Sequence, residues 1–148
     1  LQNYTTNNGE IMDNKLKHLE LIQGVINRMA SNSFKLKGWA VTLASGIFAL
    51  ASKESDKMYF LITYVPVIVF WFLDAYYLQQ ERRFRGVYND VAGLSPDDSR
   101  ITVREFEMPI QKYQCGKYCY FNVLFSRTIF PLYGIVIVGL VVTFALLF

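Results

Sequence analysis

The chain has 148 residues, enough for one domain, and 53% of them are hydrophobic. Together with a positive mean hydropathy, this composition lies above the usual range of soluble globular proteins. We attribute the net charge of +3 mainly to membrane topology and to contact with anionic headgroups, and only secondarily to a nucleic-acid surface. No specific nucleic-acid partner is therefore indicated.

The first 33 residues precede any long apolar block. Residues 1–11 are polar and featureless, and we expect a disordered leader or a cloning remnant there. Residues 12–33 are predicted to form a cytoplasmic amphipathic helix capped by Asp13, with an elbow into the bilayer at 31–33. Its apolar face, which suits a membrane surface or a neighbouring cytoplasmic helix, consists of Leu16, Leu19, Ile22, Ile26 and Met29.

A transmembrane hairpin is predicted for residues 34–78. Its two apolar blocks, 36–52 and 58–78, have about the length that a helix needs to cross ~30 Å of hydrocarbon. Only KESDK separates them, which is too short for anything but a turn. Pro66 is expected to kink the second span and to free a backbone carbonyl.

The segment 79–127 is predicted to be cytoplasmic. Span two continues as a helix until Gly93 and Pro96 stop it. Residues 101–107, ITVREFE, alternate as a short strand would, and the aromatic-rich residues 110–125 suit an interfacial helix. A third span, 128–148, contains no charged residue. The predicted fold is thus an all-α integral membrane protein with three transmembrane helices.

The basic residues predict an orientation. Thirteen of the 15 Lys and Arg residues lie before span one, at its first turn (Lys37), or between spans two and three. Lys53 and Lys57 alone lie in the turn of the hairpin. The positive-inside rule then places the N-terminus in the cytoplasm and the C-terminus outside, in a multi-pass protein of the plasma membrane.

Asp74 is the one acidic residue inside an apolar block. A carboxylate at membrane depth is costly, so its default interpretation is functional. It lies about one turn from the predicted cytoplasmic boundary and two turns from Arg82, so a structural role is the alternative: it would reach headgroup water or pair with a basic residue. Facing an oligomer axis, it would line a polar path.

A compact basic cluster, Arg82, Arg83 and Arg85, follows span two at the membrane edge. It is interpreted as a topology and lipid-headgroup anchor. The alternative is an anion site, for a nucleotide or a phosphate backbone, to which Arg100 and Arg104 would contribute. No glycine-rich phosphate loop accompanies these residues.

The sequence offers no convincing catalytic or metal set. Cys115 and Cys119 would share a helix face, but His18 is the single histidine and lies far away in sequence. We interpret both cysteines as reduced packing residues, and we expect neither a metal nor a cofactor. An enzyme acting on lipid would need paired acids near the headgroups, and the acids available are Asp74, Glu81 and Asp90.

Small residues recur in span one. Ala40 and Ala44, and likewise Ser45 and Ala49, are four positions apart, which is the spacing of surfaces that let helices pack closely in lipid. The partner of this surface is either span two of the same chain or another copy, in a homo-oligomer.

The stretch KLKHLELIQGVINRMASNSFKLKGWAVTL, residues 15–43, resembles the opening of a widespread group of small bacterial membrane proteins of mostly unassigned function. The layout of N-terminal helix, tight hairpin and long cytoplasmic helix is similar to the SLATT-type effectors found beside antiviral defence genes. The likeness covers roughly the first 90 residues, and the third span departs from a two-span pattern. It implies an oligomeric effector or accessory subunit of the bacterial inner membrane, with no catalytic residues to carry over.

Three functional hypotheses follow. The leading one is a self-associating inner-membrane effector or pore, contacting lipids and responding to a cytoplasmic protein or nucleotide ligand. The second is an anchor that recruits a soluble complex through residues 79–127. The third is an enzyme at the lipid interface, for which the sequence provides little.

Overall fold

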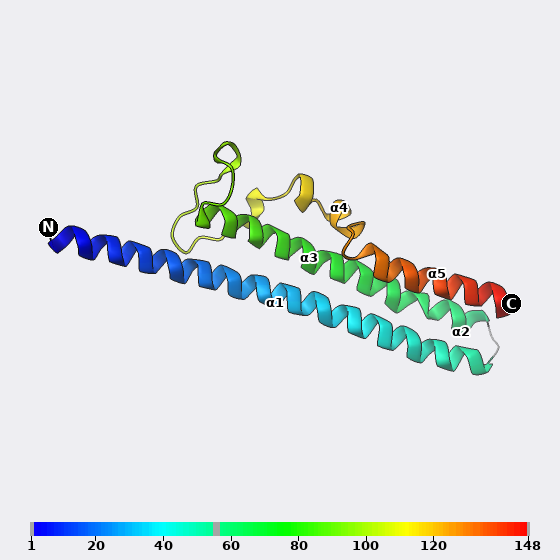
Figure 1. Ribbon diagram of the computed structural model, residues 1–148. Helices are drawn as coiled ribbons and strands as arrows, with labels where there is room; N and C mark the ends of the chain where they lie inside the picture. The colour runs from blue at the N-terminus through cyan, green and yellow to red at the C-terminus, as the bar shows by residue number, and fades with distance from the viewer. Residues whose placement is uncertain (1, 55–56, 148) are drawn as a thin grey trace.

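The computed structural model describes residues 2–54 and 57–147, and side chains within 9–51, 58 and 60–146. In these ranges the regular structure is entirely helical. The molecule is elongated: α1 (Gln2–Glu54) runs along its length, and α2 (Lys57–Ile62) and α3 (Tyr64–Ala92) return beside it (Figure 1). A last helix, α5 (Phe130–Leu147), lies along α3 at the end where the hairpin turns.

The first helix differs from expectation because it is a single helix of 53 residues. The expected elbow at 31–33, the helix start at Asp13 and the disorder of 2–11 are therefore wrong, while Leu1 lies outside the described residues. Ser33 does not cap a helix, because its hydroxyl points into the bundle and donates to Asp74. The weak helix propensity of Ser and Asn costs only a few tenths of a kcal/mol per residue, which tertiary packing readily offsets.

The returning helix is interrupted at Thr63, between α2 and α3. Pro66 has no N–H to donate to the carbonyl of Ile62, four residues earlier. Instead the Thr63 N–H bonds to the Phe60 carbonyl at 3.1 Å, as in a tighter turn. The irregularity expected from Pro66 thus lies one turn before the proline.

α3 continues without a break from the apolar block to Ala92, as predicted. Gly93 ends it with φ +81°, a left-handed conformation that glycine adopts without steric cost, and its N–H bonds back to the Asn89 and Asp90 carbonyls. The turn residues 53–57 belong partly to the undescribed part of the chain, including the side chains of Lys53 and Lys57.

The larger of two apolar cores lies where the three long helices meet. Alanines on α1 allow close approach of α3, whose buried residues in turn contact α5. Its buried members include Ala40, Ala44, Ala51, Phe60, Val67, Ala75, Val123, Leu124, Ile129 and Tyr133.

The second core lies at the other end of the molecule. Ile22 and Ile26 of α1 pack with Val87 of α3 and with Tyr113 from the loop that follows. We considered a membrane surface and a neighbouring helix as surroundings for the amphipathic segment, and in the structure it packs against α3, while Leu16 stays 53% exposed.

The segment between α3 and α5 is mostly irregular. The expected strand at 101–107 and the helix over 110–125 are both wrong. Single turns replace them: η1 (Asp97–Ser99), η2 (Ile110–Lys112), η3 (Gly116–Tyr118) and a short α4 (Tyr120–Leu124). Positive φ angles at Phe106 (58°) and Gly116 (64°) reverse the chain at points where a strand or helix would have to continue.

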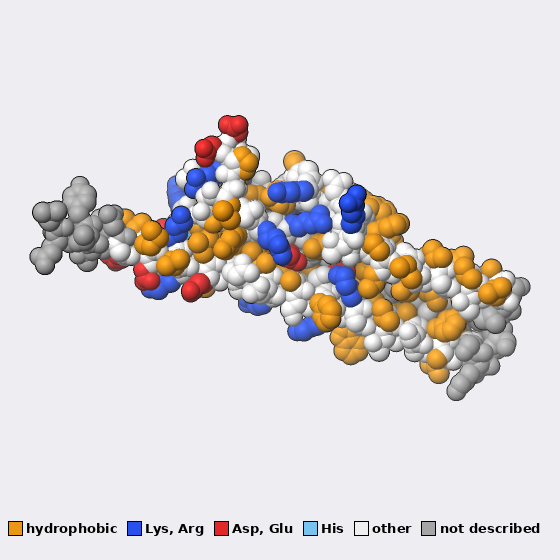
Figure 2. Space-filling view, viewed as in Figure 1, with side chains coloured by type: hydrophobic (Ala, Val, Ile, Leu, Met, Phe, Trp, Pro, Cys, Tyr) orange, Lys and Arg blue, Asp and Glu red, His pale blue; other side chains and the backbone are white. Residues whose placement is uncertain are grey.

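Two helices are long and apolar enough to cross a bilayer, over Gly9–Ala51 and Phe60–Ala92, and Phe130–Leu146 forms a shorter apolar helix. Of the residues in the most apolar stretch of each long helix, only 17% and 28% are buried. Figure 2 shows the segregation on one face: hydrophobic side chains cover the end near the hairpin turn, and Lys and Arg gather over the middle.

Candidate functional site

The buried carboxylate of Asp74 joins α1 to α3. Asp74 is fully buried, and its Oδ2 lies 2.7 Å from Nζ of Lys37, whose side chain is 18% exposed. The Lys37 ammonium also donates to Asp74 Oδ1 at 2.8 Å and to Ser33 Oγ at 2.8 Å, and the Ser33 hydroxyl donates to Asp74. Because both charges are paired and hydrogen-bonded, burial of the carboxylate is tolerated.

The same level of the bundle contains α5 and α4. The buried hydroxyl of Tyr133 lies close to the Asp74 carboxylate and donates to the Phe70 carbonyl at 3.3 Å. Trp71 stacks on the Tyr133 ring with centroids 6.2 Å apart, and its indole N–H donates to the Leu124 carbonyl at 3.1 Å. Both α4 and α5 are thus connected to α3 close to Asp74.

Lys37 and Ser33 were not singled out from the sequence, although a signal was present. Lys37 and Asp74 lie about equally far from Ser55 at the centre of the turn, so an antiparallel hairpin brings them opposite each other. Ser33 is four residues before Lys37 and therefore shares its helix face. A lysine flanking a predicted span was interpreted only as a topology signal.

A basic cavity of about 430 Å³ opens beside this ion pair. Lys37 contributes one wall, and Arg82 and Arg85 of α3 contribute another. Its remaining lining consists of Ala30, Ser33, Phe34, Leu78, Glu81 and Thr128. Arg82 donates to the Lys117 carbonyl at 3.4 Å, and an Arg85 terminal nitrogen lies 2.7 Å from the buried Glu81 carboxylate.

The five arginines considered as one anion cluster are divided by the fold. Arg82 and Arg85 share the basic cavity with Lys37, whereas Nε of Arg83 is buried with no partner among the described residues. Arg100 lies in the loop and donates to the Asp90 carbonyl at 3.3 Å, and Arg104 is exposed further along the same loop.

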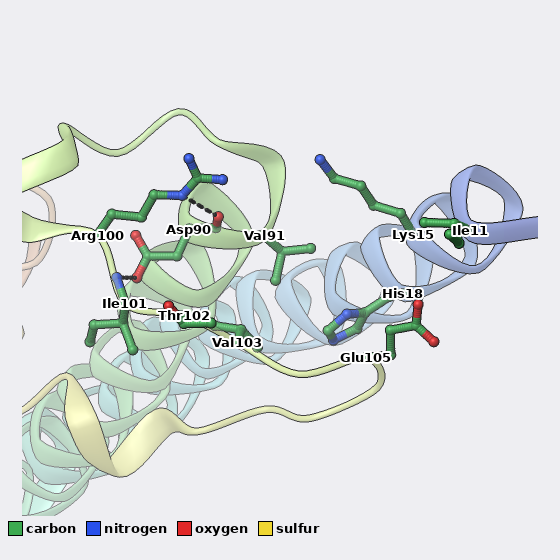
Figure 3. A pocket seen from close by; sticks show the side chains of 10 residues that line it. All are labelled: Ile11, Lys15, His18, Asp90, Val91, Arg100, Ile101, Thr102, Val103 and Glu105. Atoms are coloured by element: carbon green, nitrogen blue, oxygen red, sulfur yellow. Dashed lines mark hydrogen bonds between the residues drawn. The ribbon is translucent and has the colours of Figure 1, made fainter. Parts of the chain in front are cut away.

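A second cavity, of about 320 Å³, lies between the start of α1 and this loop (Figure 3). Lys15 and the buried His18 line it from α1, facing Asp90 and Arg100 on the other side. The His18 Nε2–H donates to the Glu107 carbonyl at 3.0 Å, which is the tautomer that a carbonyl partner requires. Both charge signs meet in this cavity, so it has no clear preference for an anion or a cation.

Asp90 organises the loop. Its buried carboxylate accepts hydrogen bonds from the Tyr113 hydroxyl and, at 3.2 Å, from the Ile101 backbone N–H. Burial, with the nearby Asp90 carboxylate, raises the pKa of the Tyr113 phenol well above its ordinary value of 10.0. Tyr113 also lies against Gly86, where a Cβ atom would be 2.6 Å from the ring. The loop therefore docks on α3 through one buried carboxylate and one glycine.

The three acids considered for lipid chemistry lie in separate contacts. Asp74 pairs with Lys37, Glu81 with Arg85, and Asp90 with Tyr113. Over the residues that the structure describes, no group of three or more His, Cys, Asp and Glu side chains could hold a metal ion. Cys115 is exposed and Cys119 is half-buried, and both are free thiols.

The small residues of span one divide between two faces of α1. Ala40 and Ala44 are buried against the bundle, whereas Ser45 and Ala49 are exposed.

Comparison with known protein families, curated proteins and solved structures finds no match to this chain.

Proposed function

We propose that the chain is a three-span protein of the bacterial inner membrane that self-associates and acts as a membrane effector, with its N-terminus and residues 79–127 in the cytoplasm. The observation that carries this proposal is the exposure of the apolar helices. A core helix of a soluble protein is mostly buried, whereas only 17% of the residues in the most apolar stretch of Gly9–Ala51 and 28% of those in Phe60–Ala92 are buried. A lipid solvent accounts for this exposure.

Exposed aromatic side chains support one membrane boundary. Phe34 and Trp39 flank Lys37 on α1, and Phe121 and Phe125 lie on the segment that Trp71 ties to α3. All four are at least 59% exposed and lie near the level of Asp74. Aromatic residues concentrate in this way at membrane interfaces. The basic cavity then lies at the headgroup level of the cytoplasmic leaflet.

Self-association is supported by the outer face of α1. Ala49 is exposed there, and a Cβ atom at Gly38 or Gly46 would meet nothing within 4 Å. Such a face lets a second helix approach closely. Asp74 is buried within the single chain, so a pore between copies would be lined by other residues.

The test is the mass of the intact assembly in a lipid nanodisc, measured by native mass spectrometry, together with a potential-sensitive dye in expressing cells. We expect several copies per particle and a fall in membrane potential. A monomer that leaves the potential unchanged contradicts the effector proposal, and extraction of the chain by alkaline carbonate contradicts the membrane location itself.

The second candidate is an anchor for a cytoplasmic complex. It is favoured by the separate apolar core at Ile22, Ile26, Val87 and Tyr113, which holds the loop in a fixed arrangement away from the apolar end. After solubilisation in a mild detergent, an anchor should co-purify with its cytoplasmic partner, whereas a self-associating effector should purify without one.

A further inference from the structure

We propose that the groove between α1 and α5, with the basic cavity at its head, binds one anionic phospholipid of the cytoplasmic leaflet. This inference rests on the proposed membrane location. It goes beyond that proposal in naming a ligand class and the residues that would select it.

The head of the site is the cavity lined by Lys37, Arg82 and Arg85, with Thr128 also in its lining. A guanidinium has five N–H donors and an ammonium three. Arg82 uses one on the Lys117 carbonyl, and Arg85 makes one ion pair, with Glu81. Both arginines therefore keep donors for a phosphate, and their planar geometry suits its oxygens.

An apolar groove continues the cavity along α1. From Phe34 and Lys37 in the cavity, the same face of α1 leads in steps of three or four residues to Val41, Ser45 and Phe48. Val41, Ser45 and Phe48 belong to one wall of a groove of about 280 Å³. The opposite wall is α5, through Ile135, Val136, Gly139, Leu140 and Thr143.

The two parts together match the chemistry of a phospholipid. Donors with positive charge lie at the level of the exposed aromatic side chains, and an apolar channel runs from there toward the hairpin turn. Asp74 pairs with Lys37 and Glu81 with Arg85, so the three cations of the cavity lining still leave one net positive charge, and an anionic headgroup is favoured over a zwitterionic one. An acyl chain in the groove would cover apolar surface that the three helices leave open.

Gly139 gives a sharp test of the acyl part. A Cβ atom there would meet nothing within 4 Å, so the residue leaves open space in the wall of the groove. Gly139→Phe should fill this space without disturbing the packing of α5. Val138→Phe is its matched control, because Val138 is 61% exposed and lies outside the groove.

The headgroup part is tested by Arg82→Gln, with Arg28→Gln as the control, because Arg28 is an exposed basic residue of α1 outside the cavity. The full-length chain in neutral detergent is titrated with phosphatidylglycerol, phosphatidylcholine of the same acyl chains, or inorganic phosphate, and followed by native mass spectrometry. We expect phosphatidylglycerol to bind about ten-fold more tightly than phosphatidylcholine, and Arg82→Gln and Gly139→Phe each to weaken it about ten-fold. Both controls should bind like the unaltered chain.

Three results would overturn the proposal. Equal binding of the two lipids removes the headgroup selectivity. Displacement of phosphatidylglycerol by inorganic phosphate, with Gly139→Phe harmless, indicates a free-anion site. A change in oligomeric mass on Gly139→Phe, with no lipid adduct on the unaltered chain, indicates that a second copy occupies the groove. Carbonate extraction of the same variants reports membrane integration separately, so failure of the lipid site is distinguishable from failure of the membrane location.

Discussion

The Lys37 ammonium lies 2.7 Å from the carboxylate of Asp74, and this ion pair connects two helices at the predicted edge of the membrane. It fixes the register of the hairpin, because sliding one helix by a turn would separate the charges and leave Asp74 buried alone. A buried pair of this kind adds little net stability compared with apolar residues, but losing one partner is costly.

Asp74→Asn should lower the free energy of unfolding by about 3 kcal/mol, because it leaves the mostly buried Lys37 ammonium without its counter-charge. Lys37→Met should cost a similar amount. The double variant should recover most of the loss, since neither charge then remains. Denaturation in mixed detergent micelles measures all three, and a double variant whose loss equals the sum of the singles would show that the two residues are not coupled.

Gly86→Ala should destabilise the docked loop by about 1–3 kcal/mol. The added Cβ atom would lie 2.6 Å from the Tyr113 ring and 2.8 Å from the Tyr118 hydroxyl, so the loop must shift. Limited proteolysis between residues 94 and 119 should accelerate. Gly24→Ala is the matched control, because its Cβ meets nothing within 4 Å and a helical alanine should stabilise by up to about 1 kcal/mol. Equal proteolysis of both variants would contradict this account of docking.

Tyr113→Phe should cost about 1–3 kcal/mol, because it removes the hydroxyl that satisfies the buried Asp90 carboxylate. It should also change the alkaline pH dependence. The pKa of Tyr113 is raised in the folded chain, so its contribution to stability is complete below the ordinary pKa of 10.0 and is lost as pH rises from there toward the raised value. The stability difference between the two proteins should therefore shrink above about pH 10. A constant difference between pH 8 and pH 11 would contradict the raised pKa.

The native thiols test the orientation. Cys115 is exposed and belongs to the segment proposed as cytoplasmic, so a membrane-impermeant maleimide should label it only after the cells are permeabilised. As a control, Ser55→Cys in a chain without Cys115 and Cys119 places a thiol in the turn on the opposite side, where labelling of intact cells is expected. Labelling of Cys115 in intact cells would reverse the proposed topology.

Much of the helical layout was predictable, and the reasons are local. The apolar blocks are long, KESDK is short, and Gly93 provides the left-handed residue that ends α3. The segment between α3 and α5 was not predictable in detail, because its conformation depends on the buried Asp90 and on reversals at Phe106 and Gly116. Alternation over seven residues says nothing about such long-range contacts.

The site was foreseen in part. Asp74 was recognised as unusual, and Arg82 and Arg85, which were singled out as one basic cluster, line the basic cavity together. The Lys37 partner and the separation of Arg100 from the cavity depend on the register of the hairpin and the path of the loop. Ser33 was misinterpreted as part of an elbow, because a serine before an apolar block is a good capping residue.

The unbroken course of α1 has a mechanical consequence. An α-helix rises about 1.5 Å per residue, so the 32 residues before residue 34 form a stiff arm of about 48 Å. With no elbow at 31–33 to absorb a change of angle, a tilt of the apolar half by about 10° would sweep the tip of this arm through about 8 Å. In the proposed membrane location, a tilt of the helix within lipid would thereby be amplified at its far end, without any rearrangement inside the helix.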